Sequence, residues 1–219
     1  MQSNPALKRA WGQFPATHGV AVLTIAISLG AMVWPGLNVA ASEGGFVPAA
    51  VDSASGITQA VPAWLTPLSS AFLHSGFLHL AFNLIMLVYC GRQVEAALGS
   101  RLWLLLYGLG IYAAAAAQWI ADPAGTIPMI GASGAISAIV GAYAAMFNQQ
   151  QVSAVGPLSS YWVRILWLAA AWIGLQLLIG LASGGDMGGS SIAIWAHIGG
   201  FVIGLLLARP LLKHRYRAR

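Results

Sequence analysis

Long uncharged, strongly apolar segments follow one another along almost the whole chain, separated by short connections that carry the few charges. Six long uncharged stretches cover residues 19–42, 53–91, 102–121, 123–163, 165–185 and 187–208. A helix that crosses a bilayer needs about 20 apolar residues. After connections are allowed for, the pattern predicts an all-α membrane protein with six transmembrane helices, namely Val20–Trp34, Leu68–Tyr89, Leu102–Ile120, Ser133–Phe147, Ile165–Ala182 and Ile192–Ala208.

The fourth predicted helix is too short to cross a membrane unaided. Ser133–Phe147 has fifteen residues, which at about 1.5 Å each give about 22 Å against a hydrocarbon core of about 30 Å. The preceding segment, 122–132, must therefore descend as irregular backbone, which is tolerated only where protein or a water-filled cavity surrounds it. We expect Ser133 below the outer surface, at the head of a shortened, centrally placed helix.

The connection between the first two helices is unusually long. About thirty residues, Asn38 to Pro67, separate them, which is too many for a bundle connection and too rich in Phe, Val, Trp and Pro for a disordered linker. We expect this loop to pack on, or dip into, the outer leaflet. Because the sequence contains no repeat and no interdomain linker, residues 1–219 are predicted to form a single domain.

Composition supports the membrane assignment, and the distribution of charge predicts the topology. The chain is 58% hydrophobic and only 7% charged, outside the range of soluble globular domains. With six helices, all ten Lys and Arg residues fall on the side of both termini, and four of the five acidic residues fall on the other. The positive-inside rule makes the termini cytoplasmic, in what we expect to be a bacterial inner membrane. The basic balance therefore indicates contact with membrane lipid and not with nucleic acid.

Polar side chains lie within three of the apolar segments. His74, His79 and Asn83 belong to the second predicted helix, where a rotation of about 100° per residue places His79 and Asn83 on one face and turns His74 away from them. His197 lies near the start of the sixth helix, beside a GxxxG face suited to close helix packing. Since the second, fourth and sixth helices begin on the outer side, these groups are predicted to lie in the outer half of the bilayer.

Ser133 and the histidines indicate nucleophilic chemistry. A serine hydroxyl needs a base to remove its proton, and an imidazole, with a pKa of about 6.5, suits that exchange. Donors at a helix N-terminus could stabilise an oxyanion. The same residues equally admit structural roles, with Ser133 as an N-cap, the glycines as packing positions and each histidine hydrogen-bonded. No carboxylate completes a triad, and no metal is expected, because His74 is predicted to point away from His79.

Three motifs occur in a defined order along the chain. They are HxxxxHxxxN at His74, His79 and Asn83, GxSG at Gly131–Gly134, and a histidine followed by glycines at His197, Gly200 and Gly204. In this order, each on its own predicted helix, they resemble the rhomboid family of intramembrane serine proteases in its compact six-helix form. The resemblance covers about residues 64–207 and implies a rhomboid-like bundle around a short fourth helix.

The resemblance also implies an activity and a role for each motif residue. The activity is hydrolysis of a peptide bond in or beside a transmembrane helix of a membrane-protein substrate, with no metal or other cofactor. Ser133 would be the nucleophile and His197 the general base, and His79, Asn83 and the Ser133 amide would form the oxyanion hole. The supporting residues would be Gly131, Gly134, Gly200 and Gly204, which shape the site, His74 and Trp64, which support the loops, and Met187, a plug in a mobile cap.

Two positions depart from the family pattern. Leu65 follows Trp64 where many members have arginine, and Ser137 stands where many relatives have an aromatic side chain that stacks on the catalytic imidazole. The orientation of His197 must then depend on another contact. Three alternatives stay open: a non-catalytic rhomboid-like protein that binds transmembrane helices, a rhombosortase-like peptidase specialised for C-terminal sorting anchors, and a transporter or metal-binding protein.

Overall fold

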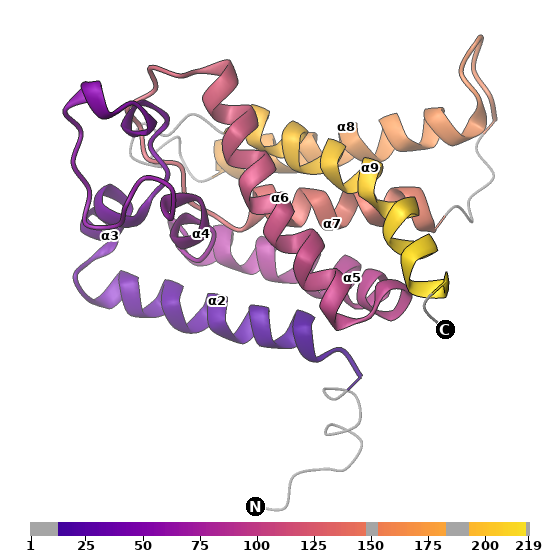
Figure 1. The fold of residues 1–219 in the computed structure, drawn as a ribbon, viewed down its shortest axis with the longest axis horizontal. Coiled ribbons are helices and arrows are strands. Elements are labelled where there is room, and N and C mark those ends of the chain that lie inside the picture. Colours follow the sequence, from indigo (N-terminus) through magenta and orange to yellow (C-terminus); the bar gives the residue numbers. More distant parts are fainter. Residues whose placement is uncertain (1–12, 148–152, 183–192, 218–219) are drawn as a thin grey trace, which may run out of the picture.

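The computed structural model describes residues 13–147, 153–182 and 193–217, and over these ranges the fold is all-helical (Figure 1). In chain order the elements are α2 Pro15–Val33, α3 Leu37–Gly44, the 3₁₀ helices η1 Pro48–Val51 and η2 Ser53–Ser55, α4 Thr66–Ser70, α5 Phe77–Leu98, α6 Ser100–Ala121, α7 Ser133–Met146, α8 Ser160–Ala182 and α9 Ile194–Arg217. Extended pairing within these ranges is limited to isolated bridges. The predicted all-α class is therefore confirmed.

Four helices in the described ranges, α2, α5, α6 and α9, are long and apolar enough to cross a membrane. The apolar helix α7 and the segment Ser160–Leu175 of α8 are shorter. The chain is thus an integral membrane protein with several apolar helices. That six of them cross the bilayer remains a prediction.

The second predicted helix, Leu68–Tyr89, is wrong at its start. α4 ends at Ser70, the chain is not α-helical over 71–76, and α5 begins only at Phe77. At this break the His79 imidazole accepts a hydrogen bond from the Ser75 N–H through Nδ1, at 3.4 Å. A side chain thus satisfies a backbone donor that would otherwise need a partner at the helix N-terminus.

Charged residues do not end the helices where the sequence pattern predicted. α5 continues past Tyr89 through Arg92 and Glu95, and α9 continues past Ala208 to Arg217. The Arg92 guanidinium lies 4.9 Å from the centroid of the Phe14 ring, so this charge has a favourable partner within the fold. The last turn of α9 is basic, which suits the negative end of the helix dipole. The predicted starts of α2 and α8 are both five residues late.

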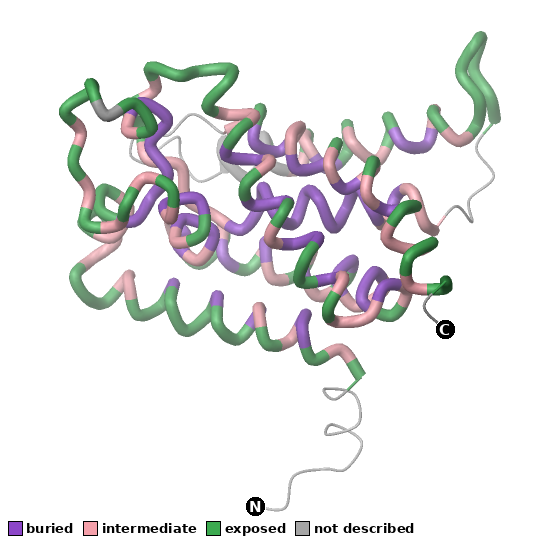
Figure 2. Tube along the Cα trace, viewed as in Figure 1, coloured by how far each residue is buried: buried purple, intermediate pink, exposed green. Residues whose placement is uncertain are grey.

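α7 lies at the centre of the helices, and most of its residues from Ser133 to Ala144 are buried (Figures 1 and 2). Glycines allow α7 and α9 to touch backbone to backbone. A methyl group at Gly204 would overlap the Ala138 carbonyl oxygen, and one at Gly141 would overlap the Phe201 carbonyl oxygen. At the far end, the Arg164 guanidinium on α8 donates to the Phe147 carbonyl, which caps α7. The position of α7 is therefore fixed by close packing along its length and by a charged donor at its C-terminus.

The long loop between α2 and α5 is folded and packs beside the segment that enters α7. Phe46 and Met129 exchange backbone hydrogen bonds of 2.9 and 2.8 Å, and Phe46 and Val47 are buried. The Gln59 amide donates to the carbonyls of Ser42 and Gly45, which closes the loop on itself. This agrees with the expectation of a packed loop, while its depth in the membrane remains a prediction.

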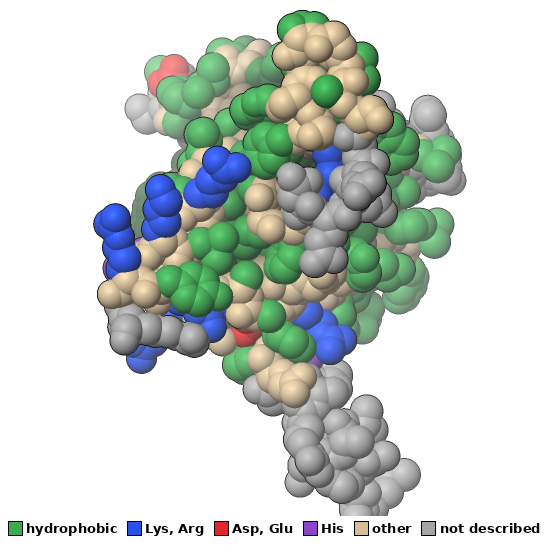
Figure 3. Space-filling view, turned by 90° about the vertical axis from the view of Figure 1, so that its right-hand side faces the viewer, with side chains coloured by type: hydrophobic (Ala, Val, Ile, Leu, Met, Phe, Trp, Pro, Cys, Tyr) green, Lys and Arg blue, Asp and Glu red, His purple; other side chains and the backbone are tan. Residues whose placement is uncertain are grey.

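Basic side chains gather at the end of the molecule where α9 terminates (Figure 3). Exposed examples are Arg101, Arg209, Lys213 and Arg217. α5 ends and α6 begins at this same end (Figure 1). That this end faces the cytoplasm remains a prediction.

Glu95 joins the N-terminus of α2 to α5. Its carboxylate accepts hydrogen bonds from the Ala16 and Thr17 N–H groups, at 3.0 and 2.8 Å, and from the Ser100 hydroxyl at 2.7 Å. The N-cap residue of α2, Phe14, supplies no capping side chain. A buried carboxylate from another helix therefore satisfies the first amides of α2 and lies at the positive end of its dipole.

Replacing Glu95 with alanine should lower the free energy of unfolding by about 2–4 kcal/mol, because two buried amides lose a charged acceptor. Glu95→Gln keeps one acceptor oxygen and should cost less. Thermal unfolding in detergent measures both effects. Equal midpoints for Glu95→Ala and wild type would contradict the capping role.

Candidate active site

Three hydrogen bonds hold the backbone on either side of Ser133. The Gly131 N–H donates to the Ser70 carbonyl at 2.9 Å, and the Ala132 N–H donates to His74 Nε2 at 3.3 Å. The Ser133 carbonyl accepts from the Ser137 hydroxyl at 2.7 Å. Gly131 has a φ of 123°, a region that disfavours any side chain. The chain thus enters α7 through a fixed turn that needs glycine.

Ser133 and His197 are in direct contact. The Ser133 Oγ lies 2.7 Å from His197 Nε2, and the two residues are 8% and 5% exposed. Ser133 is the first residue of α7, and His197 lies in the first turn of α9. A hydroxyl hydrogen-bonded to an imidazole is the arrangement that an activated serine nucleophile requires.

Glycines bring these two helices together at the level of the pair. A methyl group at Gly200, one turn after His197, would overlap the Gly134 carbonyl oxygen. Gly134 itself lies against α6, where an added methyl would come within 2.6 Å of the Ala114 Cβ. The glycines predicted to shape the site therefore occupy positions with no room for a side chain.

His74 and His79 lie closer together than predicted. Their ring centroids are 4.9 Å apart in an edge-to-face arrangement. The prediction that His74 points away from His79 is wrong, because His74 precedes α5 and the helical angle between the two residues does not apply. The described residues still contain no group of three or more His, Cys, Asp and Glu side chains placed to hold a metal.

The hydrogen bonds of His74 define its tautomer. The Ser28 hydroxyl donates to the Phe72 carbonyl at 2.7 Å, so its oxygen accepts from His74 Nδ1, 2.9 Å away. Nε2 is then free to accept the Ala132 N–H. Burial, with a smaller effect from neighbouring His79, lowers the pKa of His74 to about 3, which favours this neutral ring. His74 therefore connects α2 to the turn before Ser133.

His79 presents a ring edge to the same turn. Its Nδ1 faces Ser75, with the Ser75 N–H at 3.4 Å and the Ser75 hydroxyl at 3.0 Å, so the ring presents Nε2 to the turn. A methyl group at Gly131 would lie 2.9 Å from His79 Nε2 and 3.7 Å from the Ser133 Oγ. The His79 Nε2 and the Ser133 hydroxyl thus border the same small space, which a side chain at Gly131 would fill.

Asn83 is buried one turn further along α5. Its Nδ2 donates to the His79 carbonyl at 2.8 Å, and its Oδ1 has no hydrogen-bond partner among the described residues. One N–H of the amide is therefore used within the helix. A contribution of the second N–H to an oxyanion hole remains a prediction.

The predicted roles of Trp64 in the loops and of Met187 in the cap remain predictions. Trp64 is exposed in the loop before α4. Met187, the predicted plug of the cap, lies outside the described residues. Sequence reasoning in turn missed Ser28, Ser70 and Trp172, whose contacts reach the site. Ser28 and Ser70 carry a detectable signal, since each is a hydroxyl within or beside an apolar segment.

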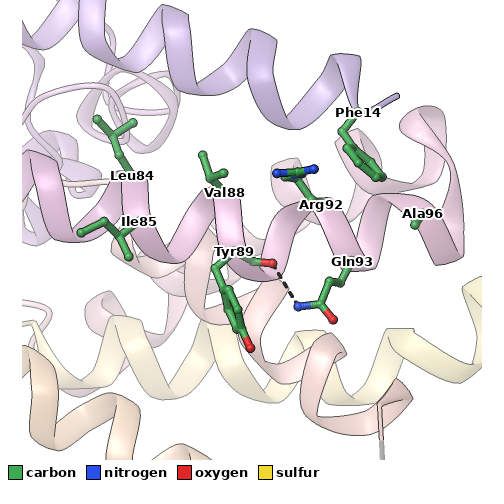
Figure 4. Close-up of a pocket in the computed structure, with 8 residues that line it drawn as sticks. All are labelled: Phe14, Leu84, Ile85, Val88, Tyr89, Arg92, Gln93 and Ala96. Carbon is green, nitrogen blue, oxygen red and sulfur yellow. Dashed lines mark hydrogen bonds between the residues drawn. The ribbon is translucent and has the colours of Figure 1, made fainter. Parts of the chain in front are cut away.

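A surface groove lies along α5 (Figure 4). It is mainly apolar and is lined by Phe14, Leu84, Ile85, Val88, Tyr89, Arg92, Gln93 and Ala96. Within it the Gln93 amide donates to the Tyr89 carbonyl at 3.3 Å, one turn earlier on the same helix. None of the predicted site residues lines it, so it is not a candidate for the reacting site.

Comparison with known proteins gives a consistent family. The Rhomboid domain profile matches residues 62–214. The chain is 31% identical over 150 residues to Rhomboid protease GlpG of Serratia proteamaculans (strain 568), a match covering 68% of this chain and 48% of that protein. It is 32% identical over 145 residues to Rhomboid protease GlpG of Yersinia pestis (strain Pestoides F), covering 64% and 46%. The chain thus spans less than half the length of these relatives. Because the profile covers more than half of the chain, including Ser133 and His197, this protein belongs to the rhomboid family.

Proposed function

We propose that this protein is an intramembrane serine protease that uses Ser133 and His197 as a catalytic dyad. The observation that carries the proposal is the 2.7 Å contact between the Ser133 Oγ and His197 Nε2 in a buried site. The Rhomboid domain match and the two proteins named Rhomboid protease GlpG support the same class of activity.

The reaction proceeds in two halves. Ser133 Oγ attacks the carbonyl carbon of the scissile peptide while its proton passes to His197 Nε2. His197 then gives this proton to the leaving amine, and the acyl group stays on Ser133. A water molecule, deprotonated by His197, attacks the acyl carbon, and the proton returns to Ser133 as the carboxylic acid leaves.

The negative charge on the substrate oxygen is stabilised at the head of α7. The Ser133 N–H lies at the positive end of the helix dipole, and His79 supplies a second N–H from Nε2. Asn83 supplies a third donor from the N–H that the helix does not use. The absence of a side chain at Gly131 leaves space for the oxyanion between these groups.

The substrates are transmembrane proteins whose helices unwind near the cleaved bond. A peptide bond inside a helix is shielded by its own hydrogen bonds, so Gly, Pro or other small residues near the bond favour its exposure. The site opens to the extracytoplasmic side of a bacterial inner membrane, with both termini cytoplasmic and six helices in one domain. The basic end of the molecule supports this orientation (Figure 3).

Two alternative functions, one non-catalytic and one a narrower protease, can be tested against this proposal. A non-catalytic rhomboid-like protein would not need the Ser133–His197 contact, which therefore argues against it. A peptidase specialised for C-terminal sorting anchors would use the same dyad. Terminal sequencing of processed membrane proteins in a deletion strain distinguishes it from a general protease.

A fluorophosphonate probe tests the proposed nucleophile directly. The Ser133 Oγ should displace fluoride and form a bond to phosphorus, so wild-type protein should be labelled and Ser133→Ala should not. Ser42→Ala removes an exposed hydroxyl on α3 that bonds to the Val39 carbonyl, and it serves as the control, with labelling equal to wild type. Gel fluorescence and mass spectrometry of the labelled peptide measure the result. Undiminished labelling of Ser133→Ala would overturn the assignment.

A further inference from the structure

Ser137 lies where α7, α8 and α9 meet. Its hydroxyl donates to the Ser133 carbonyl at 2.7 Å and accepts from the Trp172 indole N–H of α8, also at 2.7 Å. Both residues are buried, Trp172 to 4% exposure. Toward α9, a methyl group at Gly200 would come within 3.1 Å of the Ser137 Cβ, and Gly200 is one turn from His197.

The two hydrogen bonds form a complete donor and acceptor chain. An indole has one N–H to donate, and a serine hydroxyl can accept that bond while donating its own hydrogen onward. The chain ends on the carbonyl of the residue that carries the proposed nucleophile. Buried polar networks in which every group is satisfied hold their members in one arrangement.

The network completes the fixation of the Ser133 backbone. Ser70 and His74 hold the two preceding amides, and Ser137 holds the Ser133 carbonyl on the other side. The only link in this set that comes from α8 is Trp172. The first turn of α7 is therefore held from the entering loop, from within α7 and from α8.

We propose that Ser137 and Trp172 act together as positioning residues that set the first turn of α7 so that the Ser133 hydroxyl meets His197. The inference rests on the proposed function. It also explains how the dyad is oriented although Ser137 stands where many relatives have an aromatic side chain. In those relatives the aromatic side chain stacks on the catalytic imidazole, whereas here the hydrogen bond between Ser137 and Trp172 fixes the nucleophile.

The physical reason lies in the distance tolerance of proton transfer. A general base must lie within about 2.6–3.2 Å of the group that it deprotonates. A displacement of about 1 Å can cost about a hundredfold in rate. Loss of the network should therefore lower kcat and leave KM nearly unchanged, since neither buried side chain is exposed for substrate to touch.

The test compares Trp172→Phe, Ser137→Ala and the double variant, using a reconstituted transmembrane substrate. Trp172→Phe keeps the ring and removes the N–H. Each single variant should lower kcat about tenfold, with KM within about twofold, and the rate of fluorophosphonate labelling should fall in parallel. Because both act through one network, the double variant should be no slower than the slower single variant.

Matched controls separate positioning from a general loss of structure. Trp167 lies on the same helix and is 70% exposed, so Trp167→Phe should retain wild-type kcat. Ser137→Ala leaves the Trp172 N–H buried and unpaired, which should lower the unfolding midpoint. In the double variant, Trp172→Phe removes this unpaired N–H, so the unfolding midpoint should recover while kcat should not. If Ser137→Ala does not fold, Ser137→Cys, which keeps the size but bonds weakly, takes its place with the same expected fall in kcat.

Wild-type kcat in Trp172→Phe and in the Ser137 variant would overturn the inference, as would independent effects that multiply in the double variant. If the double variant recovered both kcat and the unfolding midpoint, the inference would also be overturned, because the two residues would then have only a structural role. Ser133→Ala distinguishes this failure from that of the proposed function. If Ser133→Ala abolishes cleavage while the network variants behave as wild type, only the positioning role is lost.

Discussion

Replacing His197 with alanine should reduce cleavage of a reconstituted transmembrane substrate by at least about a thousandfold. The Ser133 Oγ lies 2.7 Å from His197 Nε2, and alanine offers no proton acceptor at that position. Without a base, the serine stays a neutral hydroxyl, which is a weak nucleophile. Since alanine is smaller than histidine, the variant should fold, and its kcat should fall far more than its KM rises.

His214→Ala provides the matched control for this variant. His214 lies on the same helix, in its last and exposed turn. Its replacement should leave kcat unchanged. Equal cleavage by His197→Ala and wild type, with retained fluorophosphonate labelling, would show that another group activates Ser133.

Replacing Gly204 with alanine should disrupt the packing of α7 on α9 and abolish activity with it. The added methyl group would overlap the carbonyl oxygen of Ala138, so one backbone must move. α7 is buried along most of its length and cannot retreat easily. We expect a loss of about 3 kcal/mol in the free energy of unfolding. Because His197 lies on the displaced helix, the dyad should separate as well.

Gly108 of α6 offers the comparison that isolates this effect. Nothing lies within 4 Å of a methyl group added at Gly108. Gly108→Ala should therefore keep full activity and gain up to about 1 kcal/mol from helix propensity. Unfolding midpoints and cleavage rates of the two variants measure the difference. Similar behaviour of both would mean that α9 can move away from α7 without penalty.

The sequence predicts the helices from local information, and it predicts the proposed dyad through motifs that resemble the rhomboid family. Apolar segments mark helices wherever backbone groups must be satisfied internally. Ser133 and His197 are candidates because a polar group inside such a segment is energetically costly and is usually functional. Their motifs could therefore be assigned before the distance between them was known.

The errors come from side-chain contacts that an apolar pattern does not show, and two of these contacts join segments far apart in the chain. The break before α5 depends on a side chain that accepts a backbone N–H, so the angle between His74 and His79 could not be derived from helical periodicity. The continuation of α5 through Glu95 depends on the amides that this carboxylate caps on another helix. The bond from Trp172 to Ser137 joins residues 35 positions apart, and an apolar pattern carries no sign of it.

The contacts of the peripheral helix α2 bear on which part of the chain is needed for a stable fold. The Rhomboid domain match starts at residue 62 and leaves α2 out, yet Ser28 is the partner of the His74 ring and Glu95 caps the first amides of α2. A fragment cut at that boundary would retain every motif residue. In that fragment, however, the Glu95 carboxylate would lose the two α2 amides that donate to it, and His74 would lose the Ser28 hydroxyl that defines its tautomer. We therefore expect that a fragment must include α2 to fold as the whole chain does.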